Sequence, residues 1–405
     1  MPSWFGWIDH SEQHRRRMLD VLDLFGEQGT RDELGVAAIR DAFADMLFPG
    51  TGTLQTRARY FLFVPWMYQD LEARRIPASE VARRARKAEI ALIESLLQSP
   101  DIEGTIGRIS RAKLQRVPSN IYWSGLGRLG FLRFPGSQDQ YHRSLDHFYR
   151  LQRGVVRTDD GDLMHGVPVN WDPALPAAPA GFPEEACFRL TRDEALYLRG
   201  RIMESASCSL LAFLIDRGQQ EEVAKFPWEH PQWNRFPSHI QEQLYHARAF
   251  SEVIHGAPLL YNLMLAELRD HKEWTEHYRE RLEEWAAVMA RRSGEFASWD
   301  RRQFWAVVES GGGCPSVRTR LFVDTWLTLV LGDEGPARVA ESERARRLIR
   351  DRECALKGQL ARLENPRARV LWNGAAGTQR LAYRWPNAAV VAADILQGVT
   401  GGSDA

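Results

Sequence analysis

Apolar residues recur at helical spacing along most of this 405-residue chain, which is typical of amphipathic helices with one buried face. Several of these segments begin with a polar capping residue that is followed three positions later by glutamate, as in Thr191-x-x-Glu194. We therefore predict helices over about 9–25, 30–48, 51–72, 79–98, 238–270, 274–292, 338–363 and 383–398, with further helices beginning near Thr191 and Ser316.

Two of these segments support finer predictions. Residues 60–64 are apolar on nearly all sides, which predicts a buried helix, and Pro65 should disturb that helix because proline has no backbone donor. In the last segment we expect Pro386 in the first turn and Gly398 just after the helix ends.

Strand signals are confined to three short runs, at 131–134, 154–157 and 369–372. Residues 158–185 are rich in proline, glycine and alanine and have no sustained period, which is typical of a long connection. The sequence thus predicts a mainly α fold. It would comprise an N-terminal helical domain at 1–157, the connection at 158–185 and a C-terminal helical, bundle-like domain at 186–400.

Three glycines in the stretch WSGLGRLG, residues 123–130, have the spacing G-x-G-x-x-G. A dinucleotide-binding loop with this spacing follows a buried strand and opens a helix at the last glycine. Here the preceding residues are VPSNIYW, which come after a basic segment and do not form an apolar strand. We interpret the stretch as a short helix whose glycines allow close packing and which ends at Gly130.

The region around these glycines, at about 104–138, also fits a winged helix-turn-helix unit. One helix would precede a short turn at 116–119, a second helix would follow, and a wing-like hairpin would have Pro135-Gly136 at its tip. The alternative is a helical module that only packs or contacts protein.

Charge favours a nucleic-acid contact for this region, because it contains six basic residues and no acidic one. The whole chain, by contrast, has 53 basic and 53 acidic residues. We expect Asn120, Tyr122 and Ser124 to reach base edges, with Asn120 assigned to the nucleic-acid site. The predicted phosphate contacts are Arg108, Arg111, Lys113, Arg116, Arg128 and Arg133.

A second hypothesis places chemistry in the helical segment 246–267, where polar residues follow one side of a largely apolar helix. His246, Glu252 and His255 are the candidate catalytic residues of a metal-dependent or histidine-based hydrolase or nuclease. The alternative is a buried hydrogen-bonded network between packed helices, with a kink beside Pro258.

Other features argue against cofactors, metals and membranes. The four cysteines form no C-x-x-C pair, and His10 and His14 lack an identifiable third metal ligand, so we expect neither a metal site nor a cofactor. The N-terminus has no signal-peptide pattern, and no apolar run approaches the ~18 residues that span a bilayer. We expect a cytoplasmic protein.

Five segments together resemble a bacterial family of about this length whose function is unknown. They are GWIDHSEQHR, DELGVAAIRDAFADMLFPGTGTLQTRARYFLFVPW, PSNIYWSGLGRLGFL, FSEVIHGAPLLYNLMLAE and YRWPNAAVVAADILQG. The resemblance implies an association with helicase and nuclease genes of anti-phage defence clusters, and assigns no residue a role. Our functional expectation is a non-catalytic DNA-contacting or scaffold subunit whose partners are DNA and other protein subunits.

Overall fold

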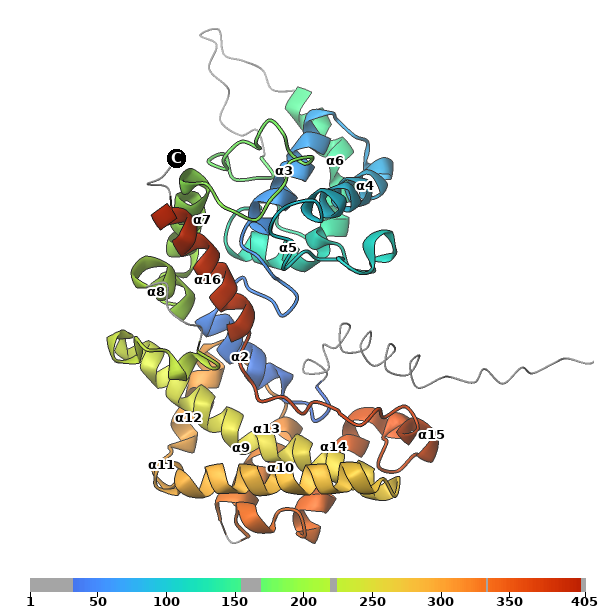
Figure 1. Ribbon diagram of the computed structural model, residues 1–405, viewed down its shortest axis with the longest axis vertical. Helices are drawn as coiled ribbons and strands as arrows, with labels where there is room; N and C mark the ends of the chain where they lie inside the picture. The colour runs from blue at the N-terminus through green and yellow to red at the C-terminus, as the bar shows by residue number, and fades with distance from the viewer. Residues whose placement is uncertain (1–31, 154–168, 219–223, 333, 402–405) are drawn as a thin grey trace, which may run out of the picture. The chain divides into compact units, whose positions relative to one another are not determined.

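The computed structural model describes residues 32–153, 169–218, 224–332 and 334–401 (Figure 1). Within these ranges the chain forms fifteen α-helices and no β-strand, which confirms the mainly α fold. The helices are α2 (Ala37–Leu47), α3 (Tyr60–Ala73), α4 (Ala78–Leu96), α5 (Pro118–Arg128), α6 (Gln138–Arg153), α7 (Arg192–Ala206), α8 (Leu210–Arg217), α9 (Ser238–Leu268), α10 (Lys272–Arg291), α11 (Ser293–Ala297), α12 (Arg301–Ser310), α13 (Val317–Leu331), α14 (Glu343–Lys357), α15 (Pro366–Arg369) and α16 (Trp385–Thr400).

The chain divides into two compact units, each assembled from segments that are distant in sequence. The first unit comprises Met1–Ala42 and Tyr245–Leu381, and the second comprises Phe43–Leu244 and Ala382–Ala405. The described part of the connection expected at 158–185 lies inside the second unit, so these boundaries differ from those drawn on the sequence. Composition does not reveal such a division, because contacts between chain-distant segments decide it.

In the second unit, α16, the last helix of the described chain, packs beside α7 and α8 (Figure 1). Two arginines just before α3 hold this arrangement. Arg57 Nε lies 3.0 Å from a carboxylate oxygen of Asp394 on α16, and Arg59 Nη2 lies 2.7 Å from Glu194 on α7. Glu194 also closes the predicted capping box, since its carboxylate accepts from Thr191 N and its own N–H donates to Thr191 Oγ1. The predicted start of α7 is confirmed.

Helix α3 is buried along residues 60–64, as predicted, and continues through Pro65. It begins at Tyr60 rather than near Thr53. The amides of Thr56 and Arg57 donate instead to the hydroxyl of Tyr122, at 2.9 and 3.2 Å. Tertiary acceptors therefore replace the helical hydrogen bonds that the local sequence would allow.

The glycines of 123–130 act in packing and helix termination, as interpreted from the sequence. A Cβ at Gly125 would lie 2.3 Å from the carbonyl oxygen of Gly50, so only glycine permits this approach. Gly130 follows α5 with a φ of 76°, the left-handed conformation that ends a helix. Gly398 differs from its prediction, because it lies inside α16, where a Cβ would come within 2.7 Å of Ala195 Cβ.

The expected first helix of the helix-turn-helix region is absent from 104–115. Gly104 and Gly107 have φ values of 84° and 82°, which a right-handed helix cannot accommodate, and the segment forms turns with one 3₁₀ turn at Arg111–Lys113. The hairpin is also not formed, because α6 begins at Gln138 and only an isolated bridge joins Leu132 to Trp171.

Of the other two predicted strands, only the run 369–372 lies in the described residues, and it is not a strand. Arg369 is the last residue of the short helix α15 and a turn follows it, while 154–157 lies outside the described residues. Hairpins and strands of three or four residues carry little local signal, and here helix packing decided the outcome.

In the first unit, α9 is one continuous helix that includes Pro258, and α10 runs beside it (Figure 1). Gly256 makes this close packing possible, since a Cβ there would lie 2.4 Å from ring atoms of Trp285 on α10. The Trp285 indole also donates to the carbonyl of Glu252 at 2.7 Å. None of the helices in the described ranges has the length and apolar character needed to cross a membrane.

Candidate nucleic-acid interface

All six basic residues predicted to contact phosphate are exposed, and all belong to the second unit. Two of them have acidic partners: Arg111 lies 3.5 Å from Glu94, and Arg133 lies 3.0 Å from Asp172. No ion pair within the described ranges involves the other four, which are Arg108, Lys113, Arg116 and Arg128.

The six residues form two groups at opposite ends of α5. Arg116 lies just before this helix and Arg128 is its last residue, so they are separated by about 16 Å at the usual rise per residue. The group around Arg116 packs against α4, because Arg86 donates to the carbonyl oxygens of Ala112 and Leu114 at 3.0 and 2.8 Å. We call this group the basic rim; it consists of Arg86, Arg108, Arg111, Lys113 and Arg116.

The turn that supports the basic rim has an unusual backbone. Arg111 has a φ of 44°, a left-handed conformation that costs a residue with a Cβ about 1–2 kcal/mol. Its N–H donates to the carbonyl of Gly107 at 2.7 Å, and Arg86 holds the following residues from α4. The backbone of this turn is therefore held in place from α4, and strained backbone of this kind is common at binding sites.

A polar cleft of about 270 Å³ opens at the basic rim, with Arg86 belonging to both. Helices α3, α4, α5 and α6 contribute its walls. The lining residues are Tyr68, Ala82, Ala85, Arg86, Glu89, Val117, Asn120, Gln138, Asp139 and His142.

A chain of hydrogen bonds runs through this cleft from Glu89 to His142. Glu89 accepts from the Ser119 N–H at 2.6 Å, and the Gln138 side-chain amide donates to both Ser119 Oγ and Tyr68 Oη, each at 2.6 Å. Because Tyr68 Oη accepts from Gln138, its own proton can point to His142 Nε2, which lies 2.9 Å away. Tyr68 Oη and His142 Nε2 thus share a hydrogen bond whose donor is set by the tautomer of the imidazole.

The electrostatics of the cleft agree with this arrangement. Burial raises the pKa of Glu89 to about 7, although hydrogen bonds from Ser119 and the charge of Arg86 oppose the shift. Burial also lowers the pKa of His142, which keeps its imidazole neutral. Near neutral pH, Glu89 can thus present either a hydrogen-bond donor or an acceptor to a ligand.

Of the three residues predicted to reach base edges, Asn120 lies on the wall of the cleft. Its side chain donates to Gln138 Oε1 at 2.5 Å and accepts from Val117 N at 3.3 Å. Tyr122 cannot reach a base, because it is fully buried and its hydroxyl accepts a hydrogen bond from the Thr56 N–H before α3. Ser124 is exposed but does not line the cleft.

The sequence-based reasoning missed Glu89, Gln138 and His142. A signal for Glu89 existed, since it occupies the buried face of α4 together with Val81 and Leu92. A carboxylate within an apolar stripe needs a partner or a raised pKa. Gln138 and His142 offered no such signal, because they begin an amphipathic helix where polar residues are ordinary.

The two histidines of the hydrolase hypothesis have separate structural partners in the first unit. His246 is buried, and its Nδ1 accepts from the Trp299 indole at 2.9 Å. His255 Nε2 lies 3.0 Å from the carbonyl of Thr378, to which it donates. Burial lowers the pKa of His255 to about 4, so the ring is neutral. The structure does not bring these histidines to one open pocket.

Glu252, the third residue of that hypothesis, is enclosed by arginines. Its carboxylate pairs with Arg248 at 3.2 Å, with Arg380 at 3.1 Å and with Arg292. Three guanidinium groups surround one buried carboxylate, which is the arrangement of a structural network rather than of a general base.

Metal ligation receives no support within the described ranges, where no group of three or more histidine, cysteine or acidic side chains could hold an ion. The histidine pair at His10 and His14 lies outside the described residues.

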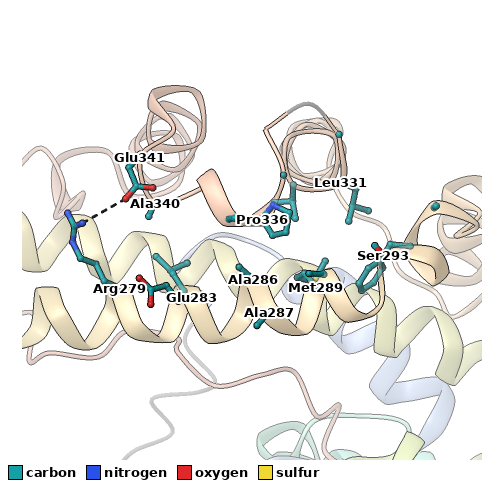
Figure 2. Close-up of a pocket in the computed structure, with 18 residues that line it drawn as sticks. Arg279, Glu283, Ala286, Ala287, Met289, Ser293, Leu331, Pro336, Ala340 and Glu341 are labelled. Carbon is teal, nitrogen blue, oxygen red and sulfur yellow. Dashed lines mark ion pairs between the residues drawn. The ribbon is translucent and has the colours of Figure 1, made fainter.

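The first unit also has an apolar groove with a volume of about 630 Å³ (Figure 2). Ala286 and Met289 of α10 face Pro336 and the end of α13 across it, while Arg279 and Glu341 form an ion pair of 3.8 Å at its edge. Its buried lining is aliphatic and aromatic, and its charged residues are exposed. Such a groove can pack an apolar group.

Comparison with curated proteins and with solved structures finds no match to this chain. A family model does match, over residues 2–397, and it confirms the resemblance seen in the sequence. This coverage is nearly complete, so the chain belongs to the family described as a family of unknown function, DUF6361.

Proposed function

We propose that the second unit contacts DNA through its sugar–phosphate backbone, with the basic rim as the contact surface. The observation that carries this proposal is the gathering of Arg108, Lys113 and Arg116 on one strained turn, exposed and without an ion pair in the described ranges. Isolated surface arginines are common, but several basic side chains gathered without ion pairs are the electrostatic pattern of a phosphate-binding surface.

The physical basis of such a contact is counterion release. Each phosphate that a basic side chain neutralises frees condensed cations, so affinity falls steeply with salt. Arg128 and Arg133, at the other end of α5, would contact the backbone about 16 Å away, leaving α5 and Asn120 facing the DNA between them. In this proposal α5 lies along the DNA backbone between the two groups, without the predicted wing.

We further propose that the protein acts as a DNA-contacting or scaffold subunit of a bacterial multi-protein system, in anti-phage defence. The resemblance to a family associated with helicase and nuclease genes supports this context. The separate, structural roles of His246, Glu252 and His255 favour a subunit without its own hydrolytic site over the hydrolase hypothesis.

The test is DNA binding by the full chain at two salt concentrations, with Lys113→Ala/Arg116→Ala compared with wild type. We expect weaker binding and a salt dependence, log K against log salt, that is shallower by about 2. The matched control is Arg74→Ala/Arg217→Ala, which removes two exposed arginines of the same unit that already pair with Asp70 and Asp216. Equal affinity of the rim variant and wild type would refute the proposed surface.

A further inference from the structure

We propose that the polar cleft takes one unpaired nucleobase, so that the DNA held at the basic rim is single-stranded. This inference rests on the proposed DNA contact and specifies its substrate. The cleft and the rim share Arg86, so a strand whose phosphates lie along the rim would present its bases at the opening of the cleft.

The walls of the cleft match the two surfaces of a base. Ala82, Ala85 and Val117 supply a small apolar wall against which a flat ring can pack. Glu89 and Asn120 supply polar groups for the ring's edge. The volume of about 270 Å³ lies near the lower end of the roughly 300–1,000 Å³ typical of small-molecule pockets, which suits one base and excludes a base pair.

Two side chains of the cleft, Asn120 and Glu89, can still form hydrogen bonds with a ligand. Both protons of the Gln138 amide are used, because it donates to Ser119 and Tyr68, and its oxygen accepts from Asn120. Asn120 Nδ2 uses one of its protons in that contact and retains a second. Glu89 is the adaptable group, because it exchanges its proton near neutral pH and can meet a donor or an acceptor.

A base within a duplex cannot enter a concave site of this kind. It is stacked and paired, and removing it from the duplex costs free energy. A base of single-stranded DNA is unpaired, so its removal costs much less. The cleft therefore predicts a preference for single-stranded over double-stranded DNA. The basic rim alone would give no preference for the single strand, because the duplex has the higher density of phosphate charge.

The test fills the cleft without altering any charge or hydrogen bond. Ala82 is exposed on α4 and lines the cleft, so Ala82→Phe should block it. Ala91→Phe is the matched control, being the same substitution at an exposed alanine of the same helix outside the cleft. Binding is measured with a single strand of DNA and with the duplex of the same length.

We expect Ala82→Phe to weaken single-strand binding by about ten-fold, the size of one lost base contact, and to leave duplex binding unchanged. Ala91→Phe should bind both as wild type does. Unchanged single-strand affinity of Ala82→Phe, or an equal loss for both forms of DNA, overturns the base site.

A second variant guards against a misfolded first one. Asn120→Ala removes an exposed amide from the cleft wall and should also weaken single-strand binding selectively. The two proposals fail differently: if the rim variant Lys113→Ala/Arg116→Ala weakens binding while Ala82→Phe and Asn120→Ala do not, the base site is wrong and the DNA contact stands. If the rim variant binds as wild type does, the DNA contact itself is wrong.

Discussion

Two buried carboxylates of the first unit, Glu252 and Glu353, differ from Glu89 of the second unit in how completely their charge is compensated. In the first unit, Glu353 is fully buried and accepts from Tyr261 Oη, Lys357 Nζ and two backbone amides, while Glu252 is enclosed by three arginines. In the second unit, Glu89 lines an open cleft and accepts a hydrogen bond from Ser119. The charge of Arg86 acts on Glu89, but no ion pair between them is formed in the described residues.

This difference separates structural from functional candidates better than residue type does. Glu252 and His255 are of residue types that are common in catalytic sites, yet their ion-pair and hydrogen-bond partners belong to the same unit. Glu89 has an ordinary glutamate side chain, but burial raises its pKa and the nearby Arg86 does not fully offset that shift. An incompletely compensated group in an accessible cleft has capacity left for a ligand.

The largest effect should come from removing the compensated carboxylate of the first unit. Glu252→Ala leaves Arg248, Arg292 and Arg380 without this shared partner and should lower the free energy of unfolding by about 3–5 kcal/mol. Denaturant unfolding measures the loss. Glu280→Ala, at an exposed position of α10, is the control and should change it by less than about 0.5 kcal/mol. A small loss for Glu252→Ala would show that this network is not structural.

The uncompensated carboxylate of the second unit should appear as a pH dependence of stability. The folded-state pKa of Glu89, about 7, exceeds its ordinary value of 4.5, so the folded chain binds this proton more tightly than the unfolded chain does. The stabilisation is full below about pH 4.5 and is lost as the pH rises to about 7. Relative to Glu89→Gln, wild type should lose about 3 kcal/mol over this window.

Unfolding measured at several pH values checks that prediction. Glu184→Gln, at an exposed glutamate of the same unit, should track wild type at every pH. A constant difference between wild type and Glu89→Gln would mean that Glu89 titrates normally and that the cleft does not perturb it.

Close packing at glycine is a feature that the units share, and it should give an intermediate effect. Gly125→Ala places a Cβ against the Gly50 carbonyl and should destabilise the protein by about 1–3 kcal/mol. Gly127→Ala, two residues away with no atom within 4 Å of the new Cβ, should instead stabilise it by about 0.5–1 kcal/mol. Thermal unfolding distinguishes the two, and similar shifts for both would contradict the packing described for α5.

The smallest expected effect tests whether clustering of charge matters for DNA. Arg318 and Arg367 of the first unit are exposed and have no ion pair in the described ranges, but they are not part of a cleft. Arg318→Ala/Arg367→Ala should bind DNA within about two-fold of wild type, since isolated surface charges contribute little at moderate salt. A loss equal to that of the rim variant would indicate a diffuse electrostatic contact without a defined surface.

Much of the helical content could be predicted because its signals are local. The capping box at Thr191 and the apolar run 60–64 were interpreted correctly, as were the packing and terminating roles of Gly125 and Gly130. Each depends on residues within one or two turns of chain. The helix expected at 104–115 was wrong because two glycines there adopt left-handed conformations that the surrounding packing selects.

The sequence by itself determined that this protein is mainly helical, that it belongs to a family of unknown function and that one segment is basic within a neutral chain. Only the tertiary structure decided which chain-distant segments form each unit and which polar residues meet. Glu89, Gln138 and His142 come from two helices, and their hydrogen-bonded chain exists only because α3 and α5 supply Tyr68 and Ser119 between them. Local patterns specify helices, whereas burial and the pKa of a carboxylate depend on every element that packs around it.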